Sequence, residues 1–87
     1  EQLPPGGLVE SMSAGLASGD YRVRLRSAEV LGAHGGKEAV PALIEAMTTE
    51  EDGYVRKSIR DALASLTGEK HSPSNPDAYR KWWEENR

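Results

Sequence analysis

The chain has no cysteine among its 87 residues. Disulfides and thiolate metal ligands are therefore excluded as sources of stability, and helix packing has to supply it. Long apolar runs are missing too, because no stretch approaches the roughly 20 residues that span a bilayer. A surplus of positive charge is also absent, since the net charge is −3. These absences predict a soluble protein without membrane spans and disfavour nucleic acid as the partner. They leave the compartment open, whether cytoplasmic or reached by export after removal of a signal peptide.

Residues with catalytic or metal-binding chemistry are few. The two histidines, His34 and His71, lie far apart in the sequence and have no cysteine or carboxylate pattern beside them. A zinc site needs three or four ligands at close spacing. No Ser or Cys nucleophile motif accompanies either histidine. We therefore expect no catalytic residue, no metal, no cofactor and no enzymatic activity.

Apolar side chains recur at helical spacing through most of the chain. Residues 1–7, EQLPPGG, are typical of an irregular lead-in or linker because they hold two prolines and two glycines. Five short helices are then expected, and no segment shows a strand pattern, so the sequence predicts an all-α fold. Two of their apolar stripes are expected to face the core: Val23, Ser27, Val30, Leu31 and His34 in the second helix, and Val55, Ile59, Ala62, Leu63 and Leu66 in the fourth.

The chain contains an internal repeat at an offset of about 32 residues. The segment DYRVRLRSAEVLGAHG, from Asp20, aligns with DGYVRKSIRDALASLTG, from Asp52. An apolar helix precedes each copy, GLVESM in one case and PALIEAM in the other. The unit is thus helix, turn, helix, and such units bury their apolar faces by stacking into a solenoid.

These copies resemble the second helix of HEAT-like repeats, the short kind found in phycobilin lyases and bacterial scaffold proteins. The shared features are Val-Arg, two small residues four and five positions on, Leu-Gly and a closing Gly. The segment GGKEAVPALIEAMTTEEDGYVR resembles the family's link between repeats, and NPDAYRKWWEENR resembles the aromatic helix that ends many such arrays. Ser27, Ile59 and Arg60 depart from the small-residue positions, and His34 replaces the usual leucine.

The expected architecture is a single domain over residues 8–87. It consists of about two HEAT-like helix pairs, near 8–35 and 37–67, and a capping helix near 76–86. Two pairs are fewer than the roughly three repeats that a stable stack usually needs. Either the terminal helices cap the stack or the chain is part of a longer repeat array.

Structural roles are expected for two sets of side chains. Arg24 and Arg56 each follow an aspartate, Asp20 or Asp52, by four residues. We expect each arginine to bond the aspartate or a carbonyl of a neighbouring repeat, so that the copies form a ladder; an anion-contact pair is the alternative. The second set comprises Tyr79, Trp82 and Trp83, which are expected to cover the apolar face of the last repeat or, alternatively, to clasp a peptide.

The second helix of each pair is mildly basic, whereas the segment that connects these helices, residues 37–54, is acidic. In solenoids of this family the second helices line the inner side. The resemblance therefore implies a scaffold that binds a protein or peptide partner on this face. The expected contact residues are Arg22, Arg26, Tyr54, Lys57 and Arg60, with Tyr21 at the edge.

Two other classes of function remain open at this point. One is a pigment-lyase-type enzyme or chaperone, an analogy that operates at the level of the fold. The other is a DNA-contacting HEAT-like module, which would bind duplexes with a steep salt dependence. A solvated surface of mixed charge also accounts for the charge pattern.

Overall fold

A computed structural model describes residues 5–71 and 75–87 of the chain, with side chains from residue 11 onward. These residues form five α-helices and a short 3₁₀ turn, and no strand occurs among them. The all-α prediction is confirmed. The elements are α1 (Pro5–Leu16), α2 (Tyr21–His34), η1 (Lys37–Ala39), α3 (Val40–Thr49), α4 (Gly53–Thr67) and α5 (Pro76–Asn86).

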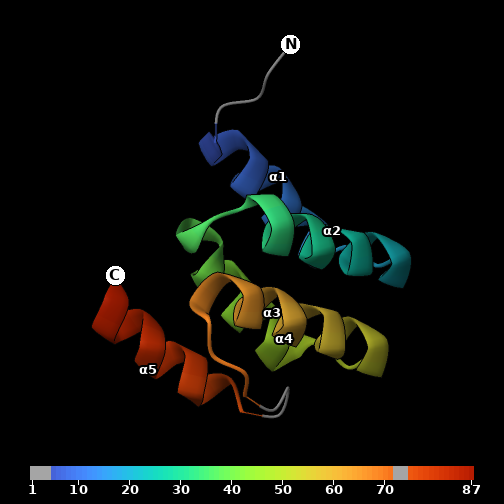
Figure 1. Cartoon of the computed structure of the whole chain (residues 1–87). Coiled ribbons are helices and arrows are strands. Elements are labelled where there is room, and N and C mark those ends of the chain that lie inside the picture. The colour runs from blue at the N-terminus through green and yellow to red at the C-terminus, as the bar shows by residue number, and fades with distance from the viewer. Residues whose placement is uncertain (1–4, 72–74) are drawn as a thin grey trace.

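The helices lie in two rows (Figure 1). The second helices of the two pairs, α2 and α4, run side by side in the same direction and share the most extensive contact in the described part of the chain. In the other row α3 lies between α1 and α5 and contacts both. Each pair is closed by packing of α1 on α2 and of α3 on α4. This arrangement is that of a short α-solenoid.

Helix boundaries follow from local chemistry. The carboxylates of Asp20 and Asp52 cap α2 and α4 by accepting bonds from the first backbone N–H groups of each helix. At the other end of α4, Gly68 adopts the left-handed conformation, with φ of 77°, that glycine tolerates best. Pro41 stands in the first turn of α3, where its missing N–H costs no helical bond.

The start of α1 differs from the expectation. We expected an irregular lead-in over residues 1–7, but α1 begins at Pro5, and residues 1–4 lie outside the described part. Proline suits a first helical turn because its fixed φ is already helical and its missing N–H would have no partner there. The proline and glycines at positions 5–7 therefore belong to the first turn of a helix.

One core joins both helix pairs. Its fully covered members come from α2, η1, α3, α4 and α5, and the largest are Leu31, Val40, Leu43, Met47, Val55, Ile59, Leu63 and Tyr79. The two second helices meet closely at Gly32 of α2, where an added Cβ would lie 2.8 Å from the Cα of Ala62. A glycine at this position therefore lets α4 pack against the backbone of α2.

The prediction that the apolar stripe of α2 faces the core is wrong at Val23. Ser27 and Leu31 are buried, but Val23 is 43% exposed, and His34 is exposed as well. The equivalent valine of the second pair, Val55, is completely buried. The reason is positional: α2 covers the side of α4 that carries Val55, whereas the same side of α2 faces away from α4.

The last helix, α5, packs on α3 through its aromatic face. Tyr79 is completely buried, and Trp82 and Trp83 are half-buried against the core. The Tyr79 hydroxyl donates a hydrogen bond to the Glu69 carbonyl at 2.9 Å and accepts one from the His71 N–H at 2.9 Å. These bonds tie α5 to the loop that follows α4.

Replacing Tyr79 with Phe tests that tie. The change leaves the Glu69 carbonyl and the His71 N–H without this partner, and a lost buried hydrogen bond costs about 1–2 kcal/mol. We expect urea unfolding to show a loss of that size. Tyr54→Phe is the matched control, since Tyr54 is 79% exposed and the loss of its hydroxyl leaves no buried group unpaired. Equal stability of both variants would contradict the assigned role.

Candidate interaction surface

The turn between the two helices of each pair is built in the same way in both repeats. Arg24 donates from Nη1 to the Ser18 carbonyl at 2.8 Å, and Arg56 donates from Nη1 to the Glu50 carbonyl at 2.9 Å. Ser18 and Glu50 are themselves 32 residues apart. Each also caps its turn, because the Ser18 hydroxyl accepts from the Asp20 N–H and the Glu50 carboxylate accepts from the Asp52 N–H. The sequence repeat is therefore matched by a repeat of hydrogen bonds.

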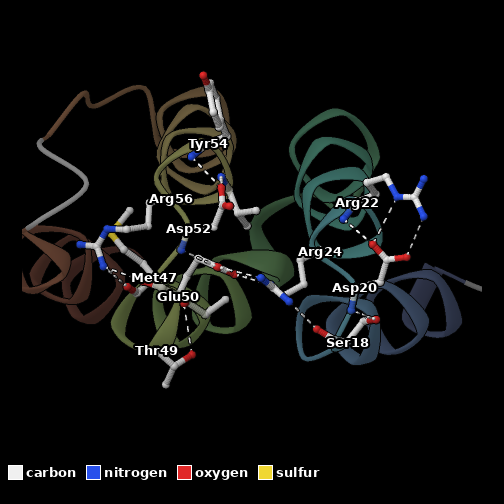
Figure 2. A network of polar contacts seen from close by, with 12 residues as sticks. Ser18, Asp20, Arg22, Arg24, Met47, Thr49, Glu50, Asp52, Tyr54 and Arg56 are labelled. Atoms are coloured by element: carbon white, nitrogen blue, oxygen red, sulfur yellow. Dashed lines mark hydrogen bonds and ion pairs between the residues drawn. The ribbon is translucent and has the colours of Figure 1, made fainter.

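Arg24 additionally links the two repeats (Figure 2). Its Nε and Nη2 donate to the two carboxylate oxygens of Glu50 at 2.7 Å and 3.3 Å. The Glu50 side chain is 4% exposed and that of Arg24 is 21% exposed. A bidentate, largely covered pair of this kind fixes the spacing of two elements. We name this contact the Arg24–Glu50 pair.

The expectation about the ladder therefore needs a correction. We expected the arginines to bond aspartates or neighbouring carbonyls, but the carboxylate that Arg24 reaches in the next repeat is Glu50, which the sequence analysis did not single out. Asp20 and Asp52 act as helix caps instead. Arg56 bonds the carbonyls of Met47 and Glu50, which belong to its own helix pair.

Asp20 lies in a small exposed cluster at the start of α2. Its carboxylate accepts a backbone bond from the Arg22 N–H at 2.9 Å and side-chain bonds from the Arg22 guanidinium. The backbone bond, followed by the side-chain bond to Arg22, holds the pKa of the Asp20 carboxyl below its ordinary value. Arg22 is thus partly neutralised by its own helix cap.

The cations expected at a shared binding face occupy different places. Leu25, two turns before Gly32, lies on the side of α2 that meets α4, and the equivalent residue of α4 is Lys57. Lys57 therefore projects from the side of α4 that faces away from α2. Arg60 is bound to Asp61 at 2.9 Å, and its side chain is only 19% exposed. The expectation of an exposed Arg60 on a shared basic face is wrong because its neighbour and the core cover it.

The shallow groove between α2 and α4 is acidic rather than basic. It has a volume of about 330 Å³. Small side chains form its floor, and Glu29 and Asp61 are its charged residues. These two acids stand at equivalent positions of the two repeats. Sequence analysis missed them because it summed charge by segment instead of by helix face.

Two tyrosines are the exposed aromatic residues of the second helices. Tyr21 is 50% exposed and Tyr54 is 79% exposed. Both tyrosines stand in the first turn of their helices. Because α2 and α4 run in the same direction, the two rings lie along the same edge of the helix array. Figure 2 shows the Tyr54 ring pointing away from the body of the protein. Arg22, with its side chain 77% exposed, is adjacent to Tyr21.

The histidine and acidic side chains of residues 5–71 and 75–87 are not arranged as a metal site. Among these residues no three His, Asp or Glu side chains gather where they could hold a metal ion. His71 pairs with Glu69 at 2.9 Å and stacks edge-on against Tyr79, so its neighbours are structural. Within the same ranges every helix is too short or too polar to cross a membrane.

Comparison with known proteins gives two matches of different extent. A family model described as HEAT repeats matches residues 6–78. The bilin biosynthesis protein PecE of Mastigocladus laminosus is 41% identical over 51 residues, which are 59% of this chain and 19% of that protein. The chain thus matches only about a fifth of the length of this curated relative. No solved structure matches significantly.

Proposed function

Because the chain belongs to the HEAT-repeat family, we propose that it is a non-enzymatic interaction scaffold. It binds a protein or peptide partner on the exposed face of its second helices, α2 and α4. The observation that carries this proposal is the exposure of Tyr21 and Tyr54 along the edge of that face formed by the first turns of α2 and α4. Tyrosine is among the residues that most often supply binding energy in interfaces, since a rigid ring offers large contact area at low entropic cost.

The arginines of α2 support the same edge of the helix array as the binding site. Arg22 is adjacent to Tyr21, and Arg26 stands one turn after Arg22 and forms no ion pair with any residue in the described ranges. Aromatic and arginine side chains together are the usual composition of an interface centre. The acidic groove between α2 and α4 lies next to them, so the face offers both signs of charge to a partner.

The test is quantitative affinity capture with the intact chain. A variant with Tyr21→Ala and Tyr54→Ala should retain its partner at least about tenfold less well, because hot-spot truncations cost about 1–2 kcal/mol or more. The control is Glu51→Ala, which removes an exposed side chain of the turn between α3 and α4. Equal retention by the tyrosine variant and the control would reject this face.

A second candidate function rests on the similarity to PecE. We propose as the alternative that the chain assists bilin handling, either as an enzyme or as a chaperone. The support is the 41% identity over 51 residues to a bilin biosynthesis protein. Titration with a free bilin, followed by its absorbance and fluorescence, decides between the candidates. Saturable binding would favour the alternative, and an unchanged spectrum would remove it.

A further inference from the structure

The side of α2 that faces away from α4 is an apolar surface that is only partly covered, by α1 at Gly15. On α4, Ala62 meets α2, and Val55 stands two turns earlier on the same side and is completely buried. On α2 the equivalent residues are Val30, which is half-buried, and Val23, which is 43% exposed. The second repeat thus shows that a helix is what covers this surface when it is occupied.

A shallow, open groove on this surface is lined mainly by apolar atoms and can accept an apolar side chain. Its volume is about 510 Å³, and its apolar lining comes from Met12 and Val23, with Ser27 between them and the core. Asp20, Arg22 and Arg26 complete the lining. Asp20 and Arg22 neutralise each other, so Arg26 supplies the net charge of the rim. We name the surface formed by Met12, Val23, Arg26 and Val30 the Val23 flank.

The rim of the Val23 flank differs in charge from the covered side of α4. Arg26 stands where α4 has Ser58, and His34 stands where α4 has Leu66. A helix that covers the Val23 flank therefore contacts the cation Arg26. At the equivalent position of α4, α2 finds the uncharged Ser58 instead. Carboxylates at the matching positions of the incoming helix would complement it.

The turn before α2 also differs from the turn before α4, which contacts the neighbouring repeat in this structure. At the junction that the structure contains, Arg24 of one repeat reaches the Glu50 carboxylate of the next. The residue equivalent to Glu50 in the first repeat is Ser18, which has no charge. An incoming repeat with an arginine like Arg24 would find no carboxylate there. The Val23 flank therefore favours an acidic helix over another copy of the repeat.

From these contacts we propose that the Val23 flank binds an amphipathic helix of a partner protein. The helix places an apolar side chain in the groove at Met12 and Val23 and directs carboxylates at Arg26. This inference names the partner class of the proposed function and rests on it. It adds a binding surface that shares Arg26 with the face of the two tyrosines and otherwise lies outside that face.

A display library of 18-residue helical peptides, randomised on one face and selected against the full chain, tests the inference. The selected peptides should carry apolar residues at i, i+3 or i+4, and i+7, with Asp or Glu beside them. Val23→Asp and Arg26→Glu should each lower their affinity by at least about tenfold. Lys57→Glu is the matched control, since it reverses an exposed cation on the far side of α4, and it should change the affinity less than about twofold.

Four outcomes would overturn the inference. The first is a selection that yields no binding peptide. The second is a set of arginine-bearing peptides that resemble α2 itself, which would make the occupant another repeat. The third is a dimer of the free chain that Val23→Asp dissociates in sedimentation, which would make the occupant a second copy. The fourth is binding that Tyr54→Ala abolishes and Val23→Asp leaves intact; this result would reject the Val23 flank and keep the proposed function.

The variants themselves need a check of folding. Val23 and Arg26 are exposed, so their substitutions should leave the thermal midpoint within a few degrees of the unaltered chain. Amide NMR shifts on addition of a selected peptide give a readout that does not depend on any variant. They should cluster in residues 20–34 of α2 and spare α4.

Discussion

Replacing Glu50 with Ala should destabilise the protein by about 3 kcal/mol, because it leaves the largely covered Arg24 guanidinium without its anion. The two side chains are 4% and 21% exposed, and they meet at 2.7 Å and 3.3 Å. The same substitution removes the acceptor of the Asp52 N–H, which the Glu50 carboxylate holds at 3.0 Å. Both losses loosen the turn that sets α4 beside α2.

Urea unfolding of the variant measures this loss. The control is Glu51→Ala in the same turn, because Glu51 is exposed and its removal should change the stability by less than about 0.5 kcal/mol. A double variant with Arg24→Leu should recover part of the loss, since it removes the stranded charge as well. Equal effects of Glu50→Ala and Glu51→Ala would show that the Arg24–Glu50 pair does not join the repeats.

The fold was predictable because its signal is repeated. Two segments 32 residues apart carry the same helical stripe, the same capping aspartate and the same following arginine. Each of these features depends on residues that are close together in the sequence, so it can be recognised there directly. Because two copies agree, a chance occurrence of the pattern is disfavoured. The first four helices and their pairing follow from that pattern, and the aromatic residues Tyr79, Trp82 and Trp83 predict the fifth.

The Arg24–Glu50 pair was not predictable in the same way. Three acidic residues in a row, Glu50, Glu51 and Asp52, look alike in the sequence. Only the turn geometry buries the first, exposes the second and makes the third a helix cap. One signal was present: Glu50 aligns with Ser18, another residue that caps its own turn, and that alignment sets Glu50 apart from Glu51.

The error at Val23 has a different cause. A helical stripe reports which residues share a face, but it does not report whether a second helix covers that face. Val23 and Val55 are identical in residue type and in repeat position, and their exposures are 43% and zero. Arg60 shows a related limit, since neighbours at i and i+1 usually point apart, yet Arg60 binds Asp61. The candidate site could therefore be located only in the structure, whereas the fold could be predicted from the sequence.

This pair of valines gives the most direct test of the central claim, that stacking of one helical pair on the next buries the apolar side chains. Val55→Asp places a carboxylate at a completely buried position between α2 and α4. An unpaired buried charge is among the most damaging substitutions, and we expect a loss of about 4 kcal/mol or more. Val23→Asp makes the same chemical change at the equivalent position of the uncovered helix.

The measurement is the free energy of unfolding of the two variants under identical conditions. The account predicts that Val55→Asp unfolds most of the protein at room temperature, whereas Val23→Asp costs less than about 1 kcal/mol, mainly through helix propensity. Equal losses at the two positions would contradict it, because burial by the neighbouring repeat would then have no part in the stability.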